Sequence, residues 1–259
     1  MPAFLSDGVE IAYTDDGPQT DATQLPVLLI HGFASNIQMN WVSTGWVRDL
    51  TAAGYRVIAI DNRGHGQSQK LYEPGDYSGP LMAGDACCLL DHLNIPRAHV
   101  IGYSMGARIA AFLAIQNPER VASVVFGGMG ANMVRPMAGT GPIAHALEAS
   151  HIDDVTNPTA RTFRAFAEQT RSDLKALAVC IRSGRVPLTP EAVSKIGCPV
   201  LVAVGSEDVI GGSAAKLAEI IPGAISFEIA GREHMKAVGD RTFKAEVLRF
   251  LERALEINP

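Results

Sequence analysis

The stretch Gly102-Tyr103-Ser104-Met105-Gly106 decides the fold of this chain. It follows a short apolar run, residues 98–101, and leads into an alanine-rich segment with a helical pattern, residues 105–116. In the pattern G-x-S-x-G the serine occupies a strand-to-helix turn so tight that flanking side chains would collide with it, so glycine is needed on both sides. Because such a turn exposes the hydroxyl, the sequence predicts that Ser104 is a nucleophile.

Short runs rich in Val and Ile recur before and after this turn. Continuous apolar runs of this length are typical of parallel strands that are buried on both faces. They cover residues 27–30, 57–60, 100–101, 121–126, 200–204 and 225–229. Helical patterns lie between or after them, at 81–93, 105–116, 213–221 and beyond the capping residue Asp240. The alternation predicts an α/β fold around a mostly parallel sheet, preceded by a hairpin that turns at residues 6–8.

The alternation breaks between Gly128 and about Pro190. No strand pattern occurs there, and three helical patterns do, at 144–147, 160–166 and 174–181. We interpret residues 128–190 as a helical cap inserted between a first core segment, residues 1–127, and a second, residues 191–259. A cap in this position would roof a pocket at the strand ends and select the substrate.

Several cap residues are candidates for the substrate pocket. Phe163 and Phe166 could form its walls, or could equally pack the cap onto the core. Met133 and Met137 could line an adaptable apolar mouth. Arg135 would add one positive charge there and is a candidate anchor for a substrate carboxylate.

Composition narrows the class of partner. With 259 residues, 47% apolar and 19% charged, the chain can bury a sizeable core as one large domain, with or without an insertion. The net charge of -5 and the lack of a lysine or arginine cluster argue against nucleic acid or an anionic membrane as partner, and favour a small-molecule substrate. No apolar run has the length of a membrane span, and residues 1–20 do not resemble a signal peptide. We therefore expect a cytoplasmic protein, monomeric or homodimeric.

The four cysteines, Cys87, Cys88, Cys180 and Cys198, do not suggest a metal site or a disulfide framework, because neither their number nor their spacing fits one. We interpret them as reduced, mostly buried small apolar residues. A redox role for the adjacent pair Cys87-Cys88 would need a neighbouring group that lowers a thiol pKa, and the sequence near them offers none.

A serine at its ordinary pKa is a poor nucleophile, so Ser104 needs a base and a group that orients the base. His234 is the best candidate for the base, because it follows the last apolar run in a loop from which the imidazole could reach over the sheet edge. Asp208 follows the preceding run in the same way and is the candidate acid, with Glu207 as the neighbouring alternative. The order Ser, Asp, His along the chain is the one expected when these side chains follow successive strands.

Five landmarks in this order resemble the α/β-hydrolase family. They are His31-Gly32-Phe33 after one strand, Asp61-Asn62-Arg63-Gly64-His65-Gly66-Gln67-Ser68 after the next, and then the serine turn, the acid and the histidine. The resemblance covers nearly the whole chain and implies an eight-stranded, mostly parallel sheet flanked by helices. It also implies that the backbone N–H groups of Phe33 and Met105 form the oxyanion hole.

The resemblance implies acyl transfer, in which Ser104 attacks a carbonyl carbon, His234 moves the proton and Asp208 stabilises the imidazolium. Such a reaction requires no metal or organic cofactor. We expect His31 to fix the oxyanion loop by hydrogen bonding, and the segment 61–68 to be a structural turn in which Asp61 and Arg63 pair with neighbouring loops. His65 is expected to be structural as well.

The leading hypothesis is a carboxylic-ester hydrolase acting on a small ester. Serine in the turn argues against haloalkane dehalogenases and epoxide hydrolases, which resemble this family but use aspartate there. Carbon–carbon bond hydrolases commonly have asparagine before the serine and tryptophan after the histidine, where this chain has Tyr103 and Met235. Such a hydrolase, an enol-lactonase or a small-molecule receptor on the same fold are the alternatives.

Overall fold

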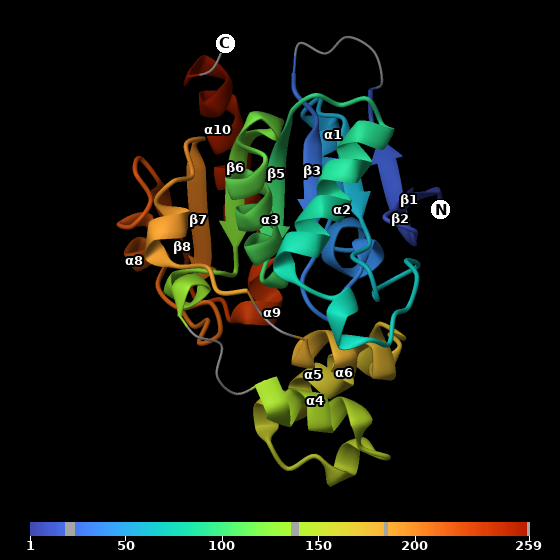
Figure 1. Cartoon of the computed structure of the whole chain (residues 1–259). Helices are drawn as coiled ribbons and strands as arrows, with labels where there is room; N and C mark the ends of the chain where they lie inside the picture. The colour runs from blue at the N-terminus through green and yellow to red at the C-terminus, as the bar shows by residue number, and fades with distance from the viewer. Residues whose placement is uncertain (19–23, 136–139, 184–185, 258–259) are drawn as a thin grey trace.

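The computed structural model describes residues 1–18, 24–135, 140–183 and 186–257 (Figure 1). Within them a single sheet has the strand order β1-β2-β4-β3-β5-β6-β7-β8. The strands are β1 Ala3–Ser6, β2 Val9–Asp16, β3 Val27–Ile30, β4 Val57–Ile60, β5 Ala98–Tyr103, β6 Val121–Gly127, β7 Val200–Gly205 and β8 Ile225–Ile229. The pairs β1–β2 and β2–β4 are antiparallel and the other pairs are parallel. The predicted eight-stranded, mostly parallel sheet and its N-terminal hairpin are confirmed.

Helices cover both faces of this sheet (Figure 1). Helices α2 (Gly79–His92) and α3 (Met105–Gln116) pack on one face, and α1 (Trp46–Ala52) and α10 (Arg241–Ile257) pack on the other. Strand β3 contributes to both cores, because its alternate side chains point to opposite faces. Burial on both sides explains why the central strands read as unbroken apolar runs.

The lengths of several elements differ from the sequence prediction. Strand β5 begins at Ala98 because the imidazole of His99 is hydrogen bonded to the hydroxyl of Ser123 on β6, at 2.8 Å, which satisfies a polar side chain inside the sheet. Helix α2 begins at Gly79, where the Ser78 hydroxyl accepts the N–H of Leu81. Helix α8 (Ala214–Ala218) is shorter than predicted, and the short helices η1 (Gln38–Val42) and α1 were not predicted.

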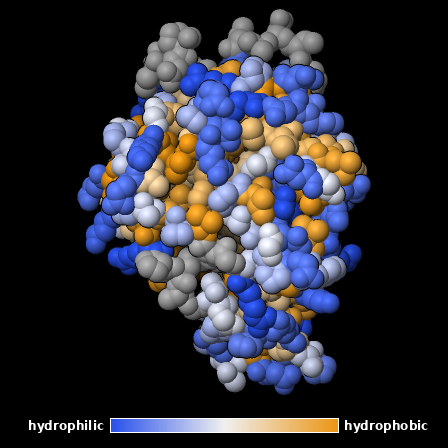
Figure 2. Space-filling model, viewed as in Figure 1, coloured by the Kyte–Doolittle hydropathy of each residue, from blue (hydrophilic) through white to orange (hydrophobic). Residues whose placement is uncertain are grey.

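Three helices form a separate lobe at the end of the sheet toward which the parallel strands point (Figure 1). They are α4 (Thr140–Glu148), α5 (Pro158–Gln169) and α6 (Leu174–Arg182), and they contain the segments predicted to be helical within the cap. The buried guanidinium of Arg164 on α5 donates to the carbonyls of Ala146 and Ala149, at 2.7 and 2.8 Å, and so satisfies the C-terminal end of α4. Hydrophilic residues cover most of the outer tip of this lobe (Figure 2).

The candidate active site lies between this lobe and the carboxyl ends of the strands. In the described part of the chain, no helix is both long and apolar enough to cross a membrane. The same residues contain no group of three or more His, Cys, Asp or Glu side chains arranged to hold a metal ion.

Candidate active site

Ser104 lies in the tight turn between β5 and α3, with backbone angles φ 55° and ψ −113°. Positive φ is strained for a residue with a side chain, and such strain is found where the surrounding structure enforces it. A Cβ atom on Gly102 would collide with the carbonyl of Gly106, and one on Gly106 would collide with the carbonyl of Ile30. The two glycines of the motif are therefore required by contacts with backbone that cannot give way.

A continuous chain of hydrogen bonds links Ser104, His234 and Asp208. The Ser104 Oγ lies 2.9 Å from His234 Nε2, and His234 Nδ1 lies 2.7 Å from Asp208 Oδ2. The other carboxylate oxygen of Asp208 accepts the N–H groups of Ile210 and Gly211, each at 2.8 Å. Because an ionised carboxylate only accepts, Nδ1 carries the ring proton and Nε2 can accept the proton of the serine hydroxyl.

His234 does not lie in a loop, as the sequence had suggested, but begins the short helix α9 (His234–Ala237). The side chain of Glu233 accepts the N–H of Met235 at 2.8 Å and starts the helix. A helix of four residues is too short to show a periodic pattern, which is why it was missed. Tyr103, the residue before Ser104, donates its hydroxyl to the carbonyl of His234 at 2.6 Å and ties the two segments together. Glu207, the alternative acid, is exposed.

The segment His31-Gly32-Phe33 is held by a buried imidazole whose tautomer is determined. The N–H of Asn62 donates to His31 Nε2 at 3.0 Å, so the proton of the neutral ring is on Nδ1 and is donated to the carbonyl of Gly32 at 2.7 Å. Burial lowers the pKa of His31 to about 4, which agrees with a neutral ring. Since the C=O and N–H of one peptide point in opposite directions, fixing the Gly32 carbonyl also fixes the direction of the Phe33 N–H.

The segment 61–68 lies beneath that loop and joins it to neighbouring elements. The carboxylate of Asp61 accepts the N–H of Ile37 at 2.8 Å, and Arg63 forms a buried two-bonded ion pair with Asp85, at 2.7 Å each. The carboxylate partner of Arg63 lies on α2 rather than in a loop. His65 is fully buried, and burial lowers its pKa to about 3.

A cavity of about 270 Å³ opens at Ser104 and His234. Phe163 and Phe166 of the lobe helix α5 line it, as the sequence suggested, and Phe163 forms an edge-to-face contact with Phe33 at a ring distance of 6.0 Å. Its described lining consists of Gly32, Phe33, Ser35, Met39, Asn40, Ser43, Thr44, Tyr103, Ser104, Phe163, Phe166, His234, Met235 and Val238. These residues include no Asp, Glu, Lys or Arg, so the cavity offers no ionic partner for a charged substrate.

Two of the three proposed mouth residues are described, and neither lines this cavity. Arg135 is exposed and does not belong to the described lining of the Ser104 cavity, which corrects its assignment to the substrate pocket. Arg135 directly follows the short helix η4 (Ala131–Val134), whose backbone is hydrogen bonded to the loop after β7. Met133 is buried, and Met137 lies outside the described residues.

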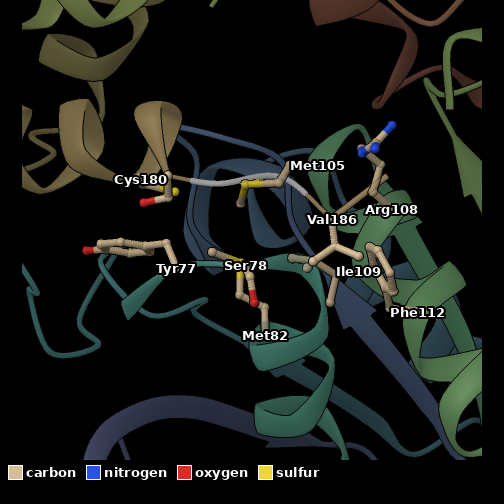
Figure 3. A pocket seen from close by; sticks show the side chains of 11 residues that line it. Tyr77, Ser78, Met82, Met105, Arg108, Ile109, Phe112, Cys180 and Val186 are labelled. Atoms are coloured by element: carbon tan, nitrogen blue, oxygen red, sulfur yellow. The ribbon is translucent and has the colours of Figure 1, made fainter. Parts of the chain in front are cut away.

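A second, smaller cavity of about 50 Å³ is lined by residues of α2, α3 and α6. Figure 3 shows the side chain of Met105 in its wall, together with Met82 and Cys180. The guanidinium of Arg108 is turned away from the centre of this cavity and donates to the carbonyl of Met133 at 2.7 Å. The Met105 side chain therefore contributes to packing between core and lobe, whereas its backbone belongs to the turn that holds Ser104.

The model of the α/β hydrolase fold family matches residues 26–144. The chain has the α/β-hydrolase fold. Over its matched part, this α/β hydrolase is 36% identical to a 2-hydroxy-6-oxononadienedioate/2-hydroxy-6-oxononatrienedioate hydrolase of Cupriavidus pinatubonensis, covering 43% of this chain and 38% of that protein. It is also 36% identical to epoxide hydrolase B of Mycobacterium tuberculosis, covering 52% of this chain and 35% of the relative. The chain spans between 25% and 41% of the length of the first curated relatives.

Solved structures match this α/β hydrolase over almost its whole length. The enol-lactonase of Burkholderia xenovorans LB400 has a TM-score of 0.78 and 24% identity, covering 97% of this chain and 100% of the other. Est816, described as an N-acyl homoserine lactone degrading enzyme, has a TM-score of 0.71 and 25% identity, covering 96% and 99%. The fold of the whole chain is thus that of the family.

Sequence reasoning missed one polar residue of this α/β-hydrolase site, Asn40. Its side-chain oxygen accepts the N–H of Gly32 at 3.3 Å, and the residue lines the Ser104 cavity. An asparagine next to Trp41 in a short, non-periodic segment gives no helical or strand signal. Its place in the site depends on the fold of the loop after β3.

Proposed function

We propose that this α/β hydrolase is a serine hydrolase that cleaves a small, uncharged carboxylic ester. The observation that carries the proposal is the hydrogen-bonded series from Ser104 Oγ through His234 to Asp208, at 2.9 and 2.7 Å, which opens into a cavity of about 270 Å³. A base within hydrogen-bond reach of a strained serine, itself oriented by a buried carboxylate, is the arrangement that activates a hydroxyl for attack.

In the proposed reaction, the Ser104 hydroxyl attacks the ester carbonyl while His234 Nε2 takes its proton. The imidazolium, stabilised by Asp208, then returns the proton to the alkoxide leaving group, and water repeats the cycle on the acyl-enzyme. The backbone N–H groups of Phe33 and Met105 would hold the oxyanion, and each such donor contributes about a hundredfold to a thousandfold in comparable sites. No step needs a metal or an organic cofactor.

The lining of the cavity supports an uncharged substrate. Bringing a carboxylate into a site without a cation would cost desolvation energy that no ion pair returns. The relative from Cupriavidus pinatubonensis is named for a substrate with two carboxylates, and the described lining offers no partner for such groups. For that reason we favour ester cleavage over carbon–carbon cleavage of a dicarboxylate.

A lactone is the second candidate substrate, since the enol-lactonase and Est816 match the chain over at least 96% of its length. Ring opening of a lactone follows the same steps, with the leaving alkoxide still attached to the acyl group. A receptor that binds its ligand without turnover is the least supported alternative. Binding alone would not require His234 and Asp208 to be aligned with the Ser104 hydroxyl. We place the protein in the cytoplasm as part of the proposal.

The test is a comparison of initial hydrolysis rates on p-nitrophenyl esters of increasing acyl length, with wild type and Ser104→Ala side by side. We expect turnover by wild type, loss of activity in the variant by several orders of magnitude, and a preferred acyl length set by the depth of the cavity. Equal activity of both proteins would remove Ser104 as the nucleophile. Activity in neither protein would shift the weight to lactones, to carbon–carbon cleavage or to a receptor.

A further inference from the structure

Asn40 lies in the wall of the Ser104 cavity with part of its side-chain amide unused. The residue belongs to η1, is only 6% exposed, and forms both of its backbone hydrogen bonds locally. Its N–H donates to the carbonyl of Asn36 at 2.9 Å, and its carbonyl accepts the hydroxyl of Thr44 at 2.7 Å. Only the side chain of Asn40 is therefore available to the cavity.

The orientation of the amide follows from its partner. The N–H of Gly32 can only donate, so the Asn40 atom that faces it at 3.3 Å is the oxygen Oδ1. The nitrogen Nδ2 then has no hydrogen-bond partner among the described residues, although it is buried. Buried amide donors without a partner are rare in folded proteins, and in a cavity wall such a donor points to a ligand.

The unused donor lies close to the reacting atoms. A Cβ atom built on Gly32 would be 3.3 Å from Ser104 Cβ and 3.9 Å from Asn40 Oδ1, so the nucleophile and the amide flank the same glycine. A substrate whose carbonyl carbon is in contact with Ser104 would bring its neighbouring atoms toward the amide. In the absence of charged residues in the described lining, the atom that this donor suits is a neutral oxygen.

We propose that Asn40 Nδ2 donates a hydrogen bond to a second oxygen of the substrate, one near the scissile carbonyl. Asn40 is then a specificity-determining residue that selects neutral esters or lactones with an ether, keto or ring oxygen beside the reacting group. Hydrocarbon esters of the same shape would leave the donor unpaired and would react more slowly. This inference rests on the ester hydrolysis proposed above.

The test uses two pairs of esters that differ only by oxygen in place of a methylene group. In the first pair, p-nitrophenyl methoxyacetate and p-nitrophenyl butyrate, the extra oxygen is in the acyl part. In the second pair, 2-methoxyethyl butyrate and butyl butyrate, it is in the alcohol part and the released acid is titrated. The measured quantity is the ratio of kcat/KM within each pair, compared between variant and wild type, so that intrinsic reactivity cancels.

The variants separate the two functions of the amide. Asn40→Asp keeps an oxygen for the Gly32 N–H and removes the donor, whereas Asn40→Leu removes both. Asn36→Asp is the matched control, since the Asn36 side chain also accepts a backbone N–H, that of Met39 at 2.9 Å, but does not belong to the described lining. Both rates of a ratio come from one preparation, so partial loss of folded enzyme cancels.

We expect Asn40→Asp and Asn40→Leu to lower the oxygen-to-methylene ratio by about three- to tenfold in one of the two pairs, as for the loss of one neutral hydrogen bond. The pair affected identifies the part of the substrate that carries the oxygen. Unchanged ratios in both pairs, with wild-type hydrolysis dependent on Ser104, would overturn the role of Asn40 alone. If wild type hydrolyses none of the four esters, ester hydrolysis and this inference fall together.

Discussion

Asp208 uses both of its carboxylate oxygens, one for the imidazole of His234 and one for two backbone N–H groups. In Asp208→Asn, the amide oxygen would keep the backbone bonds, and the amide nitrogen would face His234 Nδ1. The ring would then carry its proton on Nε2 and could not accept the proton of Ser104. We expect kcat to fall by about four orders of magnitude, with the thermal unfolding midpoint little changed.

The exposed neighbour provides the control for this prediction. Glu207→Gln also removes one negative charge, from the preceding residue, whose side chain is exposed. It should leave kcat within about a factor of two of wild type. Steady-state kinetics on one ester measure kcat, and a thermal melt measures the unfolding midpoint of each variant. Near-normal turnover of Asp208→Asn would show that the acid lies elsewhere.

Buried histidines make stability depend on pH. His99 is buried, and desolvation lowers its pKa from 6.5 to about 4 in the folded protein. Between these two values the unfolded chain binds a proton that the folded chain does not. The stability contributed by the neutral ring is therefore complete above about pH 6.5 and is lost as the pH falls toward 4. His31 and His65 act in the same direction.

We expect the free energy of unfolding in urea to decrease as the pH is lowered from 6.5, by about 1.4 kcal/mol per pH unit for each of these histidines. His99→Gln, which removes one of them, should make the dependence shallower by about that amount. His151→Gln, at an exposed site, serves as the control. Parallel curves for wild type and His99→Gln would contradict the assignment.

At the scale of an element, backbone contacts around the turn between β5 and α3 explain why the sequence motif needs glycine at position 106. A methyl group on Gly106 would meet the carbonyl of Ile30, so Gly106→Ala would push α3 away from β3 or distort the turn at Ser104. We expect a loss of stability of about 1–3 kcal/mol or more, together with a large loss of turnover, measured by denaturant unfolding and ester hydrolysis.

Gly84 in the middle of α2 is the matched control. A Cβ atom there meets nothing within 4 Å, so Gly84→Ala should be neutral or stabilise the protein by about 0.5–1 kcal/mol. If both substitutions had the same effect, the contacts of Gly106 would not explain the motif.

Elements were predictable from the sequence where they are long or fully buried. Helix α3 has the bounds expected from its pattern, and each of the strands β3 to β8 contains one of the Val- and Ile-rich runs. The short helices η1 and α9 were not predictable, because one turn of helix gives no period and is held by tertiary contacts such as the Tyr103 hydroxyl on the His234 carbonyl. Two of the residues that define the site, Asn40 and His234, lie in these helices.

At the scale of the whole molecule, the net charge of -5 and the lack of a cationic residue in the described lining of the Ser104 cavity both disfavour an anionic substrate. We expect the p-nitrophenyl monoester of succinic acid to be hydrolysed with a kcat/KM at least about tenfold below that of p-nitrophenyl butyrate, because its carboxylate would be desolvated without a partner. The difference should persist at high salt, which screens the surface charge but not the cavity. A preference for the succinate monoester would indicate a cation in the site and would favour dicarboxylate substrates.

The sequence by itself predicted the fold class, the order of strands and helices along the chain, and the candidate residues Ser104, Asp208 and His234, because each leaves a local signal: an apolar run, a helical period, or a reactive side chain shortly after a strand. Only the tertiary structure decided what surrounds those side chains. It showed that the Ser104 cavity is lined by Asn40 and two lobe phenylalanines and that Arg135 lies outside it, because a cavity is formed by segments distant in sequence whose relative positions no local pattern encodes.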